Sequence, residues 1–192
     1  MSHEIYDMLR ESIRVKKRIA ETKIGEIEHI VKSIVTTYES GGKVVLCGNG
    51  GSAADAQHIA SELVGQFEVK NRRALPAIAL TTNTSILTAI GNDYGYDAVF
   101  TRQVEALVGE KDTVIAISTS GNSPNVVEAI KAAKKKGAKT ISLTGRSGGK
   151  LAQVSDINIS VPSDSTPRIQ EAHITIGHII CALVEKEIEN ID

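Results

Sequence analysis

Several residue types that would identify common protein classes are rare or missing in this chain. It contains no tryptophan and its aromatic share is 3%, so it offers no obvious platform on which bases or sugar rings would stack. Its 22 Lys and Arg residues against 23 Asp and Glu residues leave a formal net charge of -1. This balance excludes a long-range field that would attract nucleic acid or an anionic membrane. Recognition therefore has to rely on small polar and charged groups.

Cysteines and long hydrophobic runs are scarce as well. Cys47 and Cys181 match no metal-ligand spacing and are too few for a disulfide framework, so we expect both to be buried thiols in a reducing compartment. The longest apolar stretch, 174–184, is interrupted by polar residues and is too short to span a bilayer. The N-terminal segment is charged throughout and has no apolar signal core. These features predict a cytoplasmic protein that binds no membrane.

Hydrophobic periodicity divides the 192 residues into a helical start and an alternating remainder. Residues 1–40 carry two helical repeats, which end at Gly41 and Gly42. Five short β-branched runs follow, at 43–47, 76–80, 113–117, 139–143 and 156–161. Apolar strands of that length indicate burial on both faces, as in a parallel sheet covered by helices. We predict a single α/β domain over 1–192, a three-layer α-β-α sandwich with a five-stranded parallel sheet, preceded by an N-terminal helical hairpin.

Four helices are expected between and after these strands. One opens near Ser52, one covers 97–107, one runs over 124–136 and the last begins near Pro167. Pro124 suits a first helical position, with Ser123 as the cap before it. Ligands of such sheets bind at the carboxyl ends of the strands, so the loops after the strands are where a functional site is expected.

Two polar loops follow strands that should lie near each other. The first, 48–52, matches neither a phosphate-binding Walker loop nor the dinucleotide fingerprint. Its glycines still let backbone N–H groups approach a ligand, and Ser52 opens a helix whose N-terminus favours an anion. The second, 118–123, sets four hydroxyls and an amide before another helix N-terminus. Each alone is explained by a capped turn, but the two together favour phosphate binding.

Two more glycine-containing loops follow the same pattern less strongly. The segment 144–149 has fewer hydroxyls and is interpreted as a turn. The segment 91–95 is also interpreted as a turn, although Asn92 and Asp93 carry groups that could bond sugar hydroxyls.

Side chains that handle protons or metals occur on two of the expected helices. His58 and Glu62 are four residues apart and share a helix face; such a pair can hold a divalent metal, although it is more often an ion pair. In the last helix, Gln170 and His178 are two turns apart and point to broadly the same side, whereas His173 and His178 do not. A histidine among isoleucines is usually a hydrogen-bonded core residue, so these groups remain only suggestive without a fold that joins them.

Four segments together resemble the phosphoheptose isomerases of the sugar-isomerase (SIS) domain superfamily. They read CGNGGSAADAQHIASELVG, PAIALTTNTSILTAIGNDYGYDAVFTRQVEAL, ISTSGNSPNVVEAI and PSDSTPRIQEAHITIGHII. The resemblance covers nearly all of the chain beyond the N-terminal helices. It implies conversion of D-sedoheptulose 7-phosphate into D-glycero-D-manno-heptose 7-phosphate through an enediol, which feeds activated heptose into lipopolysaccharide core or surface polysaccharide. It also implies a homotetramer, packed partly through residues 1–40, with active sites between subunits that would bring the two helices together.

The resemblance also implies a role for each matching residue. The proton-transfer pair would be Glu62 and His178, and one zinc ion per subunit would be held by His58, Glu62, Gln170 and His178. The remaining matches would bind substrate. The glycine loop would contribute Asn49, Gly50, Gly51 and Ser52, and the phosphate would be held by Ser118, Thr119, Ser120 and Ser123. The sugar hydroxyls would meet Asn92 and Asp93, and Gln170 and Glu62 would also contact the substrate. Two positions depart from the pattern, since Gln66 stands where many members carry arginine and Pro167 where they often carry alanine or aspartate.

Two rival hypotheses belong to the same superfamily. A sister protein that binds the replication initiator keeps the fold without the chemistry, but it lacks the glutamate and the final histidine that Glu62 and His178 supply here. A muramic acid phosphate etherase would be longer and would lack the spacing from Gln170 to His178. The residues therefore favour the isomerase hypothesis.

Overall fold

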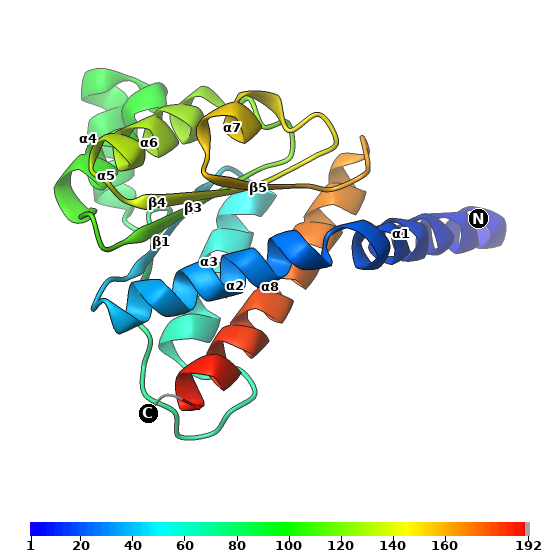
Figure 1. The fold of residues 1–192 in the computed structure, drawn as a ribbon. Helices are drawn as coiled ribbons and strands as arrows, with labels where there is room; N and C mark the ends of the chain where they lie inside the picture. The colour runs from blue at the N-terminus through cyan, green and yellow to red at the C-terminus, as the bar shows by residue number, and fades with distance from the viewer. Residues whose placement is uncertain (191–192) are drawn as a thin grey trace.

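A computed structural model describes residues 1–190, which form one parallel sheet with helices on both faces (Figure 1). The strands are β1 (Val44–Gly48), β2 (Ala77–Ala79), β3 (Thr113–Ser118), β4 (Lys139–Thr144) and β5 (Ile157–Ser160). Their order in the sheet is β2-β1-β3-β4-β5, and every neighbouring pair is parallel. The three-layer sandwich with five parallel strands predicted from the sequence is confirmed.

The helices include all of those predicted, with 97–107 divided in two, and two that were not predicted. Their bounds are α1 (Ser2–Thr22), α2 (Ile24–Glu39), α3 (Gly51–Val64), α4 (Thr84–Tyr94), the 3-10 turn η1 (Tyr96–Ala98), α5 (Thr101–Leu107), α6 (Pro124–Lys135), α7 (Gly149–Val154) and α8 (Thr166–Glu189). Among the described helices, none has both the length and the apolar character needed to cross a membrane.

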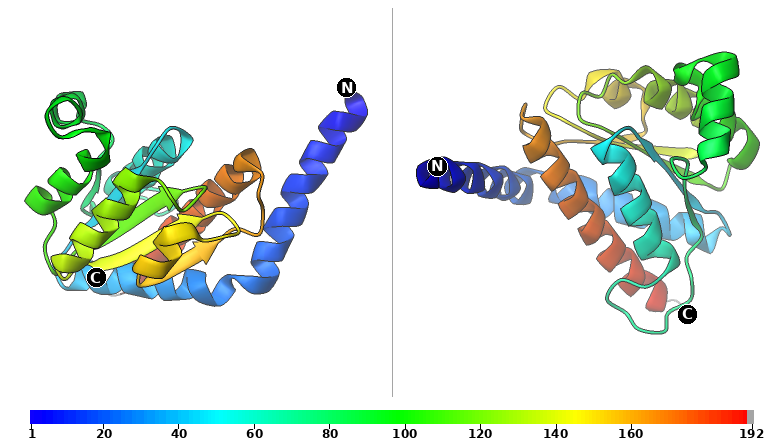
Figure 2. Two further views of the ribbon diagram at one scale, coloured as in Figure 1. Left: turned by 90° about the horizontal axis from the view of Figure 1, so that it is seen from above. Right: turned by 180° about the vertical axis from the view of Figure 1, so that it is seen from behind.

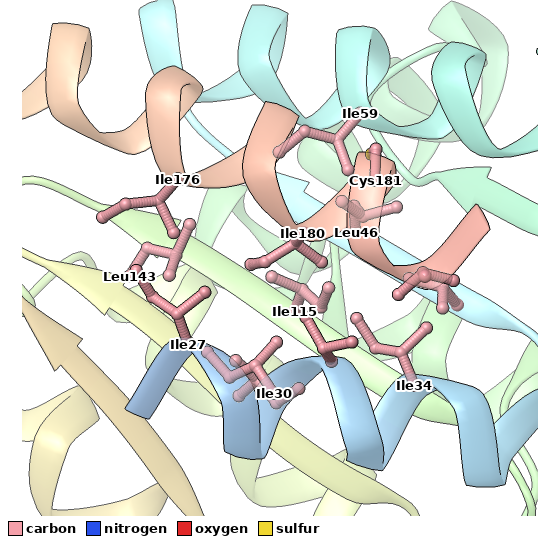
Figure 3. Packing of buried hydrophobic residues seen from close by; sticks show 14 of the residues in the cluster. Ile27, Ile30, Ile34, Leu46, Ile59, Ile115, Leu143, Ile176, Ile180 and Cys181 are labelled. Atoms are coloured by element: carbon pink, nitrogen blue, oxygen red, sulfur yellow. The ribbon is translucent and has the colours of Figure 1, made fainter. Parts of the chain in front are cut away.

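Side chains that alternate along the strands pack into two separate hydrophobic cores, one on each face of the sheet. Leu46 of β1 and Ile115 of β3 belong to the core shared with α2, α3 and α8, whereas Val45 and Val114 face the core shared with α5, α6 and α7. Figure 3 shows the first core, with isoleucines of α2 packed toward those of α8 over the sheet. Burial on both faces explains why the strands read as continuous apolar runs.

The helices α4 and α7 were not predicted: the turn expected at 91–95 is the end of α4, and the turn expected at 144–149 runs up to the first residue of α7. Asn83 caps α4 by accepting a hydrogen bond from the Ile86 N–H, at 3.0 Å, but no residue of α4 is buried. Of its side chains, Leu87 and Ile90 pack partly buried against the second core, and so short an apolar stripe is not revealed by periodicity. The predicted helix over 97–107 is likewise divided, with a 3-10 turn before α5.

The two N-terminal helices do not fold back on each other as a hairpin. They meet at Lys23, and α1 projects away from the body of the molecule (Figures 1 and 2). Only Val15 and Ile19 of α1 are buried, while Ile5, Met8, Leu9 and Ile13 are each more than half exposed. The apolar repeat of α1 therefore marks a face that this chain alone leaves uncovered.

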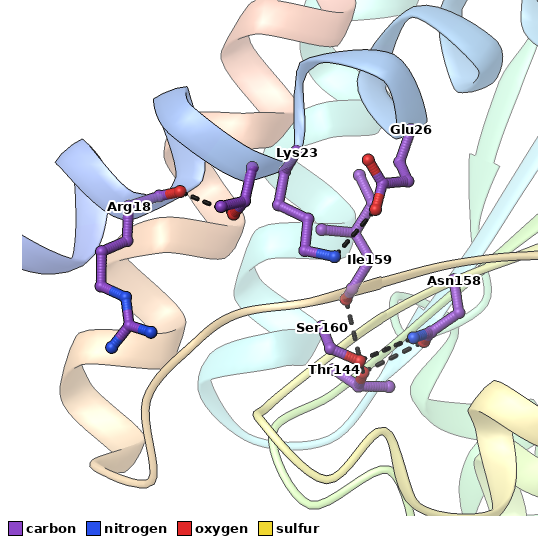
Figure 4. A network of polar contacts seen from close by, with 8 residues as sticks. Arg18, Lys23, Glu26, Thr144, Asn158, Ile159 and Ser160 are labelled. Carbon is purple, nitrogen blue, oxygen red and sulfur yellow. Dashed lines mark hydrogen bonds and ion pairs between the residues drawn. The ribbon is translucent and has the colours of Figure 1, made fainter.

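A polar network fixes the ends of β4 and β5, close to the carboxyl edge of the sheet. The Thr144 hydroxyl donates to Asn158 Oδ1 at 3.0 Å, and Asn158 Nδ2 donates to Ser160 Oγ at 2.8 Å (Figure 4). The same view shows Lys23 paired with Glu26 at 2.8 Å where α2 begins. The network holds the start of the loop after β4 in place.

Candidate functional site

Three metal-capable side chains from α3 and α8 converge in a single chain. His58 Nε2 lies 3.0 Å from Glu62 Oε1, and His178 Nε2 lies 3.3 Å from His58 Nε2. One ligand atom from each residue lies within 4.8 Å of the other two. The expectation that a subunit interface is needed to join the two helices is therefore wrong, because α3 and α8 pack side by side within one chain.

Gly177 allows this close approach of the two helices. A Cβ atom built there would lie 2.7 Å from Ile59 Cδ1, and Ile59 is buried. The next residue, His178, is thereby brought against His58, which precedes Ile59. The sequence contains both halves of the cluster, but the helix contact decides that they meet.

The donor set of this cluster fits a zinc ion. Two imidazole nitrogens and a carboxylate oxygen are the ligands that zinc commonly takes in proteins. The facing ring nitrogens of His58 and His178 can satisfy each other only if one carries a proton and the other does not, whereas a cation between them would take both lone pairs. The predicted ligands His58, Glu62 and His178 therefore suit a metal. The predicted fourth ligand, Gln170, stands two helical turns before His178 on α8.

Gln170 is placed at the glycine loop. A Cβ on Gly51, the first residue of α3, would come within 2.4 Å of the Gln170 amide nitrogen. Gly51 lies two helical turns before His58, so Gln170 joins the start of α3 to the start of α8. With glycine at 51, the Gln170 amide can approach the first turn of α3 closely.

Asn49 in the glycine loop, residues 48–52, is held by two neighbours that no sequence pattern indicates. Its amide and that of Asn125 in α6 exchange hydrogen bonds of 2.9 Å, and the Tyr96 hydroxyl donates to Asn49 Oδ1 at 3.2 Å. The amide NH2 of Asn49 has two protons. One is donated to Asn125, which leaves the other for a ligand. Ser52 is not the cap expected, because Gly50 occupies that position and Ser52 is buried in the first turn.

The serine loop, residues 118–123, brings three of its hydroxyls close together. Ser118 Oγ lies 3.0 Å from Ser123 Oγ and 3.4 Å from Ser120 Oγ. Ser123 stands at the cap position of α6 as predicted, but it makes no side-chain cap bond. The first N–H groups of α6 are thus not used by its hydroxyl, and such groups favour an anion.

The loop after β4, residues 144–149, packs against the serine loop. A Cβ on Gly121, whose φ is 67°, would lie 2.2 Å from Gly148 O, and the Gly145 N–H donates to Thr119 O at 3.0 Å. A hollow of about 320 Å³ opens between these two loops and the start of α8; its lining includes Thr119, Ser120 and Arg146. This gives the segment 144–149 a positioning role beyond that of a turn.

Asn92 and Asp93 lie near the end of α4, and both are exposed. Asn92 Nδ2 donates to Asp93 Oδ1 at 2.8 Å, and Asp93 lines a groove between α4 and α5 together with Tyr94 and Arg102. Their predicted contact with sugar hydroxyls thus starts from a helix end and not from a turn.

Two residues near the cluster were missed from the sequence. The ring of Phe67 stacks on that of His178, with centroids 5.4 Å apart and an interplanar angle of 23°. Asp55 precedes His58 by one helical turn; burial raises the pKa of its carboxyl, partly opposed by His58, and its Oδ2 is buried without a hydrogen-bond partner. The spacing of Asp55 from His58 was a readable signal, whereas nothing in the sequence links Phe67 to His178.

His173 and the two cysteines belong to the core. His173 is fully buried, its Nε2 lies 3.1 Å from Thr144 O, and burial lowers its pKa to about 4. Cys47 and Cys181 are buried free thiols, and burial raises the pKa of each to about 12. The hydrogen-bonded core histidine of α8 is thus His173, whereas His178, the histidine among the isoleucines, belongs to the cluster. The predicted burial of both thiols is confirmed.

Known proteins resemble this chain over nearly its whole length. The SIS domain family matches residues 8–145. The phosphoheptose isomerase of Sulfurimonas denitrificans is 54% identical over 98% of this chain and 97% of its own length, and that of Aquifex aeolicus is 55% identical over 97% of each. The solved phosphoheptose isomerase structure from Neisseria gonorrhoeae superposes with a TM-score of 0.91 at 44% identity, covering 96% of this chain and 98% of that one. The chain belongs to the phosphoheptose isomerase family of SIS-domain proteins.

Proposed function

We propose that this protein is a ketose–aldose isomerase that converts D-sedoheptulose 7-phosphate into D-glycero-D-manno-heptose 7-phosphate. The observation that carries the proposal is the meeting of the Glu62 carboxylate and the His178 imidazole on helices whose first turns adjoin the glycine loop. Membership of the phosphoheptose isomerase family supports the same reaction. The product would supply activated heptose for lipopolysaccharide core or another surface polysaccharide.

The reaction needs one base and one acid in reach of neighbouring carbons. A base removes a proton from C1 of the ketose while the C2 oxygen gains one, which gives an enediol. The O1 proton then leaves and C2 is protonated, so no electron acceptor is consumed. We assign Glu62 to the carbon protons and His178 to the oxygen protons, since paired groups of this kind can work near neutral pH. Because Glu62 Oε1 is engaged with His58, Oε2 is the atom assigned to proton abstraction.

Zinc is the ion that we propose for the cluster, one per subunit. His58, Glu62 and His178 would hold it, and Gln170 would complete the set implied by the family resemblance. Such an ion acts as a Lewis acid toward oxygens that gain negative charge. The chain's own residues still bind and orient the sugar, through the remaining Asn49 N–H and the amide of Gln170.

The phosphate is assigned to the serine loop. Ser118, Thr119, Ser120 and Ser123 would donate to its oxygens, joined by the first N–H groups of α6. Asn92 and Asp93 are assigned to sugar hydroxyls, with Gly50, Gly51 and Ser52 lining the path between the two loops. The hollow beside Thr119 and Ser120 leaves room for these groups to turn toward a ligand.

We further propose that the chain works as one domain in a cytoplasmic homotetramer. The uncovered apolar face of α1, formed by Ile5, Met8, Leu9 and Ile13, supports packing between copies, because an isolated soluble chain gains nothing from such a stripe. Active sites near subunit boundaries would follow if the partner covers the exposed side of α4 or of the cluster.

Incubation with sedoheptulose 7-phosphate tests the function directly. The purified protein is assayed for the aldose phosphate after treatment with zinc and, separately, after removal of metal with a chelator. We expect turnover with zinc and a large loss without it. Absence of product under both conditions would contradict the proposal, and retention of a replication initiator by the same protein would favour the non-catalytic sister instead.

A further inference from the structure

A segment without regular secondary structure connects α3 to the strand β2 and is clamped by a single buried carboxylate. This segment, residues 66–72, is called the strap below. Glu185 of α8 accepts hydrogen bonds from the backbone N–H groups of Phe67 at 2.7 Å, Glu68 at 2.8 Å and Val69 at 3.1 Å. It also accepts from Arg72 Nε at 2.5 Å. The side chains of Glu185 and Arg72 are only 1% and 3% exposed.

So many donors on one buried carboxylate indicate a specific structural purpose. Burial alone would raise the pKa of Glu185, but the backbone N–H groups and the Arg72 guanidinium outweigh it and the pKa is lowered. Glu185 is therefore a charged anchor at neutral pH. A buried ion pair is seldom the most stabilising choice for a core, so its value here is the conformation that it fixes.

Residues at the two ends of the strap contact the two members of the proposed proton-transfer pair, His178 and Glu62. On one side, Phe67 stacks on the imidazole of His178. On the other, the Arg72 NH2 group donates to the backbone carbonyl of Glu62 at 2.6 Å. Glu185 itself lies two turns beyond His178 on the same helix. One carboxylate thus ties the strap to α8, and through Arg72 to the end of α3.

We propose that Phe67, held by the Glu185–Arg72 clamp, is a positioning residue that fixes the ring plane of His178 so that its Nε2 faces His58 and Glu62. His178 is otherwise flanked by His58 in an edge-on contact, with ring centroids 4.9 Å apart at 74°. The stack restricts rotation of the imidazole about its terminal side-chain torsion, which is otherwise broad. The inference rests on the proposed function only for its catalytic consequence; the orientation of His178 toward a metal stands apart from turnover.

Zinc affinity of Phe67 variants tests the inference independently of the reaction. Phe67→Leu keeps an apolar side chain and removes the ring, while Phe67→Tyr keeps the ring. Groups that orient metal ligands typically change affinity by about 10- to 100-fold when removed, so we expect Phe67→Leu to bind zinc about tenfold more weakly, measured by competition with a chromophoric chelator. Phe67→Tyr is expected to match the wild type. Both variants should show the same thermal unfolding.

The clamp is tested with a second pair on α8. Glu185→Gln is expected to weaken zinc binding as Phe67→Leu does, whereas Glu187→Gln, at an exposed position of the same helix, should leave it unchanged. If Glu185→Gln fails to fold, the comparison of Phe67→Leu with Phe67→Tyr is the test of the inference. Equal zinc affinity in Phe67→Leu and wild type, or no zinc affinity in the wild type, would overturn the inference. Weaker zinc binding in Phe67→Leu, together with no turnover by the wild type, would refute the proposed isomerase and leave the positioning role standing.

Discussion

At the scale of single residues, the chemistry assigned to Glu62 depends on a carboxylate oxygen that can accept a proton. Glu62→Gln preserves shape and removes that capacity, and general bases contribute about 10²- to 10⁴-fold to turnover. We expect kcat for sedoheptulose 7-phosphate to fall by about 10³-fold in this variant.

The matched control for this substitution is Glu128→Gln, since Glu128 is exposed on α6 and pairs only with Lys131 at 2.8 Å. Circular dichroism should show both variants folded as the wild type. Normal turnover by a folded Glu62→Gln protein would remove Glu62 from the role of base.

His173 makes the stability of the fold depend on pH. Its folded pKa of about 4 lies below the ordinary value of about 6.5, so the unfolded chain binds more protons between these values. Stability is therefore full above pH 6.5 and declines as the pH falls toward 4. Between pH 7.5 and 5 we expect His173 to account for a loss of about 2 kcal/mol in the free energy of unfolding.

Chemical denaturation at the two pH values measures this loss. His173→Gln, which keeps an N–H donor near Thr144 O, should show a decline smaller by about that amount. An unchanged decline in the variant would mean that other groups cause the pH dependence.

At the scale of elements, the contact between α3 and α8 decides whether a site exists. Alanine in place of a mid-helix glycine normally stabilises a helix by about 1 kcal/mol. At Gly177 the added Cβ would press on Ile59, and overpacking of a core costs about 1–3 kcal/mol. We expect Gly177→Ala to lower stability and also to reduce zinc affinity, because the helices must separate.

Gly25 in α2 provides the comparison for Gly177, since a Cβ there would meet nothing within 4 Å. Thermal unfolding of Gly25→Ala should show equal or higher stability with unchanged zinc binding. A stabilised Gly177→Ala protein would show that the two helices are free to adjust.

At the scale of the whole molecule, α1 exposes an apolar face, formed by Ile5, Met8, Leu9 and Ile13, that the single chain leaves uncovered. Replacing Leu9 and Ile13 by glutamate should abolish assembly while leaving the fold of each chain intact, because both side chains are exposed by 60% and 66% in the monomer. Light scattering would show the mass falling toward 20.5 kDa.

The polar face of the same helix supplies the control for this double substitution. Arg14→Glu changes the charge of α1 by a comparable step at another exposed position and should retain the assembled mass. A double variant that assembles like the wild type would exclude this face of α1 from the interface.

The sequence by itself determined the sheet and the family, and it supplied most of the candidate site residues. Strands buried on both faces are continuous apolar runs, so β1 and β3 were visible, as was the cap position of α6. The motifs around Asn49, Ser118 and His178 were sufficient to indicate the family. Sequence patterns predict these features because the periodicity of neighbouring residues reflects the local backbone geometry and the buried face.

Only the tertiary structure decided which side chains meet. The spacing of His58 and Glu62 could not tell that His178 joins them within one chain, since that depends on how closely Gly177 lets α8 approach α3. Periodicity did not reveal α4, whose apolar contact with the core is limited to partly buried side chains. Nor did it reveal the strap, whose shape is set by Glu185 more than a hundred residues away in the sequence. Contacts between distant segments follow from packing in three dimensions, and a linear pattern does not encode that packing directly.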